Sequence, residues 1–199
     1  MIHLLDSSLE TMLRREFKTR FSDSVDISFA PPDGEFPTSS VTVPAVDLFL
    51  YDVRENNVLR SQDWLVKRGS DGFAVQERPP VRVDCSYLIT AWPSPKVRKP
   101  AEDEHKILSV VMAVLLSYTE LPDEILAEPL RGQEPPPIAT ALQPGHLQSL
   151  AEFWQAMGGK PKLALNYTVT IGLRALPDIR TRTVLQTEIH LQEINGGRS

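Results

Sequence analysis

The sequence of 199 residues has one cysteine, no excess of positive charge and no long apolar run, and each absence excludes a class of protein. The single thiol, Cys85, cannot form an internal disulfide, which fits a reducing compartment. The net charge of −5 argues against nucleic acid as the main partner. The longest apolar run, residues 107–116, is about half a membrane span, and the N-terminal stretch lacks the basic flank of a signal peptide. We therefore expect a soluble protein without membrane insertion.

Motifs of the common enzyme classes are also missing. The sequence contains no G-x-S-x-G elbow, no P-loop, no G-x-G-x-x-G and no paired-cysteine spacing. Cys85 falls on the apolar side of an alternating stretch, where a small buried hydrophobe is expected rather than a reactive thiolate. The histidines His3, His146 and His190 fall at a chain end, a helix start and a late strand. We expect no enzymatic activity, no catalytic residue and no cofactor.

One acidic cluster resembles a metal site in its spacing. Glu102 and His105 form an E-x-x-H pair, which supplies two ligands in di-iron helix bundles. Such a site needs a second E-x-x-H on another helix, and the sequence has none. Pro100 and the carboxylates at 102–104 instead match the start of a helix, whose positive end they stabilise. We interpret the cluster as the start of a buried helix and expect no metal.

The hydrophobic pattern predicts a mixture of helices and strands. Helical spacing marks residues 4–20, 101–118 and 147–157, the last stopped by Gly158-Gly159, with a short helix at 121–126. Alternation predicts strands at 24–30, 81–92, 162–173 and 179–194, and the stretch 46–53, which is apolar on both faces between two aspartates, predicts a further strand. Residues 46–53 have the pattern of a central strand, and the twelve residues 81–92 are long enough to project beyond a sheet. A hairpin-like turn signal lies at 67–72 and a proline-rich connector at 131–140. The expected fold is α+β, with a mixed, mostly antiparallel sheet flanked by helices.

A small basic loop follows Trp92 and contains Lys96, Arg98 and Lys99. It is too small for a nucleic-acid surface, and the acidic balance of the chain opposes one. Two interpretations stay open: a solvated loop, or a protein-docking site, since tryptophan and arginine are favoured interface anchors.

Three stretches together resemble one family. They are VDLFLYDVREN at 46–56, RPPVRVDCSYLITAW at 78–92 followed by EDEHKIL at 102–108, and EFWQAMGGKPKLALNYTVTI at 152–171. In this order they resemble the N-terminal domain of cap, or tail-terminator, proteins of extracellular contractile injection systems, which are phage-tail-like particles. The resemblance implies a cap domain at 1–173, related in fold to phage tail terminators, followed by a C-terminal strand or arm and frayed tail at 174–199.

The resemblance also implies a function. Such a cap forms a sixfold ring on the distal end of the inner tube and binds the last sheath ring, so its partners would be the inner-tube protein, the sheath protein and other copies of itself. It would lie in the cytoplasm at assembly and then in the particle. The family has no established catalytic residues. The long strand and the alternating C-terminal segment offer sheet edges for pairing with neighbouring subunits or sheath arms.

Two other classes of function stay open at this point. One is an adaptor module that binds a single protein partner without forming a ring. The other is a small enzyme whose site residues are scattered beyond motif recognition; a perturbed carboxylate pair in a pocket would favour it.

Overall fold

Two β-sheets and three α-helices make up the computed structural model, which describes residues 1–21, 24–61, 63–68, 73–145, 147, 149–174, 177 and 179–182. The chain divides into two compact units. Unit 1 contains residues 1–60 and 81–173, and unit 2 contains residues 61–80 and 174–199. The predicted boundary after Leu173 stays a prediction.

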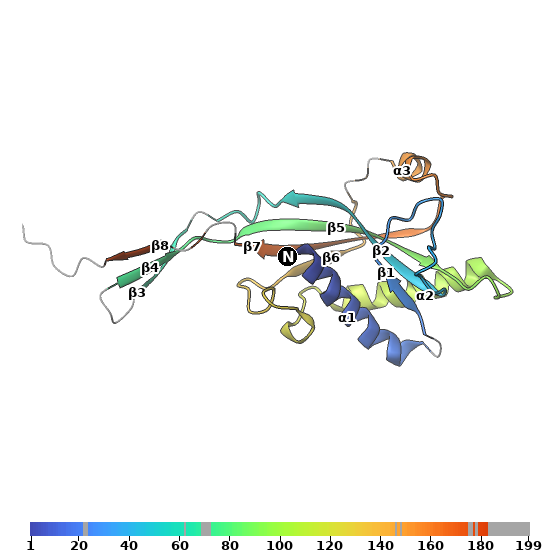
Figure 1. Ribbon diagram of the computed structural model, residues 1–199, viewed down its shortest axis with the longest axis horizontal. Helices are drawn as coiled ribbons and strands as arrows, with labels where there is room; N and C mark the ends of the chain where they lie inside the picture. The colour runs from blue at the N-terminus through green and yellow to red at the C-terminus, as the bar shows by residue number, and fades with distance from the viewer. Residues whose placement is uncertain are drawn as a thin grey trace, which may run out of the picture. The chain divides into compact units, whose positions relative to one another are not determined.

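Unit 1 is built on a five-stranded sheet with the order β1-β2-β5-β7-β6 (Figure 1). Its strands are β1 (Asp26–Ser28), β2 (Ala45–Glu55), β5 (Val81–Trp92), β6 (Ile138–Ala141) and β7 (Ala164–Leu173). Only β1 runs parallel to its neighbour; all other pairs are antiparallel. The predicted α+β class with a mixed, mostly antiparallel sheet is confirmed.

The central strand of this sheet is β5. It pairs with β2 over Val83–Trp92 and with β7 over Val81–Thr90. The expectation that β5 projects beyond the sheet is wrong, because β2 and β7 have 11 and 10 residues and match its 12. Residues 46–53 were predicted to form a central strand, with a neighbour on each side. Strand β2 has two neighbours only at Ala45–Asp47, where it pairs with both β1 and β5; among the described strands, the rest of β2 pairs with β5 alone.

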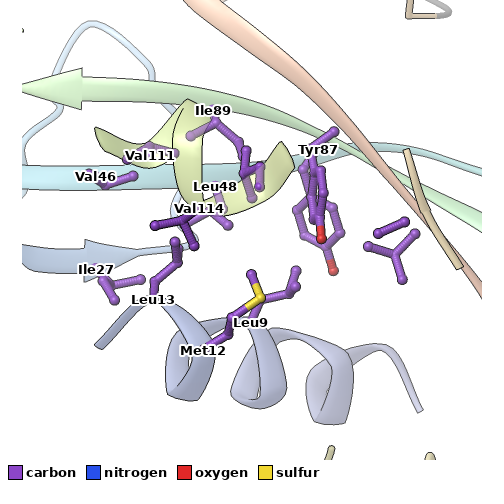
Figure 2. Close-up of a cluster of buried hydrophobic side chains, with 14 of the residues drawn as sticks. Leu9, Met12, Leu13, Ile27, Val46, Leu48, Tyr87, Ile89, Val111 and Val114 are labelled. Atoms are coloured by element: carbon purple, nitrogen blue, oxygen red, sulfur yellow. The ribbon is translucent and has the colours of Figure 1, made fainter. Parts of the chain in front are cut away.

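Helices α1 (Ile2–Arg20) and α2 (Pro100–Ser117) pack on one face of the sheet and form the main core with it (Figure 2). The predicted helical spacing is confirmed, because the buried stripe of α1 contains apolar residues that recur every three or four positions: Leu5, Leu9, Met12, Leu13 and Phe17. From β5, alternate residues enter this core, among them Cys85, which is fully buried. Burial raises the pKa of the Cys85 thiol to about 11, and the expectation of a small buried residue at this position is confirmed.

The opposite face of the sheet carries the short helix α3 (Leu150–Ala156), whose Phe153 ring lies 6.0 Å from the ring of Phe49 on β2. The helix begins three residues later than predicted, because the Ser149 side chain accepts a hydrogen bond from the Glu152 N–H and caps it there. It ends at Ala156, one residue before the predicted end, and Gly158 then adopts a left-handed conformation with φ of 67°.

This second face is also where the sheet buries polar side chains. Thr170 donates to Asp84 over 2.6 Å, and the hydroxyls of Ser86 and Thr168 are 3.1 Å apart. Asp47 is fully buried, and neither of its carboxylate oxygens has a hydrogen-bond partner of good geometry. Burial raises the pKa of Asp47 to about 7, a rise that the nearby Ser28 hydroxyl opposes only in part.

The segment between α2 and α3 differs in part from its prediction. The expected short helix at 121–126 is a single 3₁₀ turn, η1 (Asp123–Ile125). The proline-rich connector predicted at 131–140 ends in strand β6, which was not predicted. The strand was missed because the prolines at 135–137, just before it, have no N–H to donate and are not typical of a strand. In the structure the Ala139 N–H bonds the Thr119 carbonyl on one side, and β6 pairs with β7 on the other.

Unit 2 contains a second sheet of three antiparallel strands in the order β3-β4-β8: β3 (Leu65–Arg68), β4 (Phe73–Glu77) and β8 (Ile179–Arg182). The antiparallel pairing of β3 with β4 agrees with the turn signal at 67–72, of which residues 69–72 lie outside the described part. Of the strand predicted at 179–194, the first four residues form β8, and the rest, with the predicted frayed tail, lies outside the described part.

Candidate functional site

The predicted docking loop lies between the end of β5 and the start of α2. Pro93 and Pro95 have no N–H to continue the β-ladder, and the chain turns where the Val97 N–H bonds the Ser94 carbonyl over 3.3 Å. Helix α2 then begins at Pro100, a favoured first helical residue because its N–H would be unpaired there in any case. The backbone therefore presents residues 96–99 at one end of the sheet.

Trp92, predicted as an anchor for a partner, makes its contacts within its own chain. Its indole is half-buried, with the Phe36 ring 4.6 Å away and the Lys162 ammonium 4.6 Å from the ring centroid. Its Nε1 donates to the Thr90 hydroxyl over 2.9 Å. The indole thus holds together β5, the loop after β1 and the segment before β7, and its part in docking stays a prediction.

The lysine over this indole is fixed by an ion pair. Lys162 Nζ lies 2.7 Å from the Glu104 carboxylate, and the two side chains are only 14% and 16% exposed. At this burial, loss of one partner leaves a charge that water solvates poorly. The pair joins α2 to the start of β7, and we did not predict it because 58 residues separate its members in the sequence.

The three cations of the loop differ in their pairing. Lys99 forms an ion pair with Glu102 over 2.8 Å. Lys96 and Arg98 are exposed, and neither forms an ion pair with any residue that the structure describes. Two exposed positive charges without an ion-pair partner among the described residues therefore lie in this short loop, in a chain whose net charge is −5.

The E-x-x-H pair lies in the first turns of α2, which confirms that the acidic cluster starts a helix. Glu102 is fully exposed, and its bonds to Lys99 and then Lys106 lower its pKa. His105 is also exposed. Across the described residues, no group of three or more histidine, cysteine or acidic side chains is arranged to hold a metal ion.

A cavity of about 590 Å³ opens beside this loop. It is lined by Asp33, Gly34 and Phe36, by Trp92, by Glu104 and His105, and by the segment from Gly158 to Leu163. Gly34 closes one side, where its N–H bonds the Met157 carbonyl and an added Cβ would come within 3.0 Å of the Gly158 oxygen. Asp47, the carboxyl group whose pKa burial raises to about 7, is not among the lining residues.

Comparison with known proteins relates the chain to contractile injection systems. Residues 5–183 match the family described as the Pvc16 N-terminal domain. One similar solved structure is the sheath/tube terminator, in the extended state, of the extracellular contractile injection system PVC, with 25% identity and a TM-score of 0.68 over 100% of this chain. The anti-feeding prophage cap, described as a tube-terminating cap, is 24% identical with a TM-score of 0.63 over 92% of this chain.

This chain spans 65% and 60% of the length of those two proteins. A search of curated proteins finds no significant match. Among the described helices, none has the length and apolar character needed to cross a membrane. The family match extends over most of the sequence and all of the five-stranded sheet, and it agrees with the resemblance carried by residues 46–56, 78–92, 102–108 and 152–171. The chain belongs to the Pvc16 N-terminal domain family.

Proposed function

We propose that this protein is a structural cap, which ends the inner tube of a contractile injection particle and holds the last ring of its sheath. The observation that carries the proposal is the match of residues 5–183 to the Pvc16 N-terminal domain, together with the fold shared with a sheath/tube terminator. We assign the cap domain to residues 1–173 and an arm to 174–199. The cap has no catalytic role in this proposal.

The physical need for such a protein follows from how tubes grow. Head-to-tail contacts repeat without limit unless a subunit with a different outer face stops them. The end ring of a sheath also lacks the next layer of contacts and needs a substitute. A cap therefore needs one surface for the tube, one for the sheath and one for other copies of itself, and we assign it a sixfold ring assembled in the cytoplasm and then carried in the particle.

We place one docking surface at the basic loop. Lys96 and Arg98 carry exposed charges without an ion-pair partner in the described chain, which makes them available to an acidic surface of the tube or sheath. Complementary charges of this kind mainly increase the rate of association, and salt screens them over about 10 Å at 0.1 M ionic strength.

The proposal is tested by deleting the gene and imaging the particles by electron microscopy. We expect scarce, overlong or prematurely contracted particles, and recovery of normal particles when the gene is restored. Uniform, contractile particles in the deletion strain would refute the cap function and favour an adaptor with a single partner.

The docking surface is tested with a double charge reversal, Lys96→Glu with Arg98→Glu. The matched control is Arg15→Glu with Lys18→Glu, which makes the same change in net charge at exposed positions of α1. We expect the first variant to cap purified tubes more slowly and with less dependence on salt, and the control to behave as the native protein. Equal capping by both variants at low salt would remove the loop from the interface.

A further inference from the structure

Among the described strands, only β1 pairs with the outer edge of β2, and it ends early. Strand β1 pairs only with Ala45–Asp47, because Pro31 and Pro32 follow it and cannot donate to a β-ladder. Beyond that point β2 continues to Glu55 with β5 on its inner side, and no other described strand lies on its outer side. In Figure 1 this second half of β2 runs along the margin of the sheet.

The register shows which backbone groups face outward. The Asn56 N–H bonds the Arg82 carbonyl over 2.8 Å, so Asn56 faces β5. In an antiparallel pair the hydrogen-bonding direction alternates along the strand. Val53 and Glu55 therefore direct their N–H and C=O groups away from β5, past the irregularity between Leu50 and Asp52. Such an edge is a template for another strand.

An apolar cavity of about 650 Å³ lies beside the same edge. Val53, Val83, Ile171 and Leu173 line it from three strands, and Met1, Ile2 and His3 line it from the start of α1. The Val53 side chain is 44% exposed, which is unusual for a valine in a sheet with a buried face. A strand added to β2 would place every second side chain on this face, over the cavity. The site fits an extended peptide with aliphatic residues at alternate positions.

The same chain has a segment of that chemistry. Twelve residues, TVLQTEIHLQEI at 183–194, follow β8 and lie outside the described part; their sequence alternates weakly, with Leu185, Ile189 and Leu191 on one set of positions. Twelve extended residues can span about 40 Å. We propose that the edge of β2 at Val53–Glu55 and the apolar cavity beside it bind residues 183–194 of a second copy of this chain.

Each copy would then give one strand and take one strand. A contact of this head-to-tail kind closes into a ring when the rotation between copies permits it. The inference rests on the proposed function, because a cap ring requires contacts between copies, but it names a contact that the cap function does not itself require.

Two full-length variants separate the two halves of the contact. Val53→Pro removes an outward N–H without removing a bond to β5, and so blocks the acceptor edge. Gln186→Pro with Ile189→Pro removes one N–H on each side of the segment, and so blocks the donor. The controls are Val53→Ile and the pair Gln186→Thr with Ile189→Val, which keep every N–H and the aliphatic side chains at 53 and 189. Circular dichroism and melting curves check that each variant folds.

Size-exclusion chromatography with light scattering should show oligomers for the native chain and the conservative controls, and monomers for each proline variant alone. Mixed in equal amounts, the two proline variants should form a one-to-one pair, because one keeps the donor and the other keeps the acceptor. A synthetic peptide of residues 183–194 should bind the donor-blocked variant at least tenfold more tightly than the Val53→Pro variant.

Oligomers that persist in the donor-blocked variant, or two proline variants that do not pair, would refute the exchange of strands between copies. So would a peptide that binds both variants equally, and this result does not depend on oligomers forming. A chain that folds its own segment onto its own β2 would give monomers throughout and no mixed pair. All these outcomes leave the deletion test of the cap function unaffected, so the two proposals can fail separately.

Discussion

Replacing Asp47 by asparagine should stabilise the protein at neutral pH and remove a pH dependence of its unfolding. The carboxyl group is fully buried without a hydrogen-bond partner of good geometry, and its pKa rises from 3.8 to about 7. At about 1.4 kcal/mol for each pH unit, this rise corresponds to about 4 kcal/mol.

The sign follows from where the proton is held. Below pH 3.8 the Asp47 carboxyl is protonated in both the folded and the unfolded state, so no charge is buried and this group does not make stability depend on pH. Between pH 3.8 and about 7 the folded protein keeps a proton that the unfolded chain has lost, so the free energy of unfolding falls as the pH rises. Above pH 7 the folded protein holds the carboxylate in its charged form, and the full penalty of about 4 kcal/mol persists. Asparagine carries no charge at any of these values.

Urea unfolding at pH 4.5, 6.0 and 7.5 measures the effect. We expect Asp47→Asn to exceed the native protein by about 2–4 kcal/mol at pH 7.5 and to approach it at pH 4.5. Glu124→Gln removes an exposed carboxylate and serves as the control, with a change within about 0.5 kcal/mol. An Asp47→Asn variant with the native pH slope, or with lower stability at pH 7.5, would refute the reasoning.

Three further predictions concern the buried residues: a core leucine, an ion pair and the cysteine. Leu9→Ala should cost about 2–5 kcal/mol in chemical unfolding, because Leu9 is fully buried between α1 and the sheet (Figure 2), while Val58→Ala, at 92% exposure, should change stability by less than about 0.5 kcal/mol. Lys162→Met should lower the free energy of unfolding, because it leaves the buried Glu104 charge without its partner. Adding Glu104→Gln should recover part of that loss. If the double variant instead loses as much stability as the two single variants added together, the two side chains are not coupled as an ion pair. Cys85 should resist alkylation by iodoacetamide at pH 8 until the protein unfolds, and rapid labelling of the native protein would show that the thiol is accessible.

The parts of the fold that could be predicted from sequence are those in which a local pattern matches the final burial. The apolar stripe of α1 repeats at helical spacing, and β5 and β7 alternate over ten or more residues. In each of these elements the residues that the pattern marks as apolar are largely those that the fold buries. Strands β3 and β6 have four residues each, too few to show a period, and β6 becomes a strand only by pairing with β7, about 30 residues later. Its pairing is a property of the tertiary structure.

The candidate site divides in the same way. That Lys96 and Arg98 are exposed follows from their place in a proline-rich loop, which the sequence shows. That Lys162 covers the ring of Trp92 and binds Glu104 depends on three segments meeting in space. No spacing rule along the chain joins residues 58 and more positions apart, so these contacts had to come from the structure.

The central place of β5 has a consequence for how the protein is made. Strand β2 leaves the ribosome before β5, but β7 follows much later, since Val81 pairs with Leu173. At about 5–20 residues per second, roughly 5–20 seconds pass before the newly made β5 can meet this partner. During that interval its apolar face and one full edge have no strand beside them, which is the condition under which nascent chains aggregate. Synthesis interrupted before β7 should therefore yield a product that accumulates in inclusion bodies or stays bound to chaperones, whereas release after residue 173 lets the sheet close.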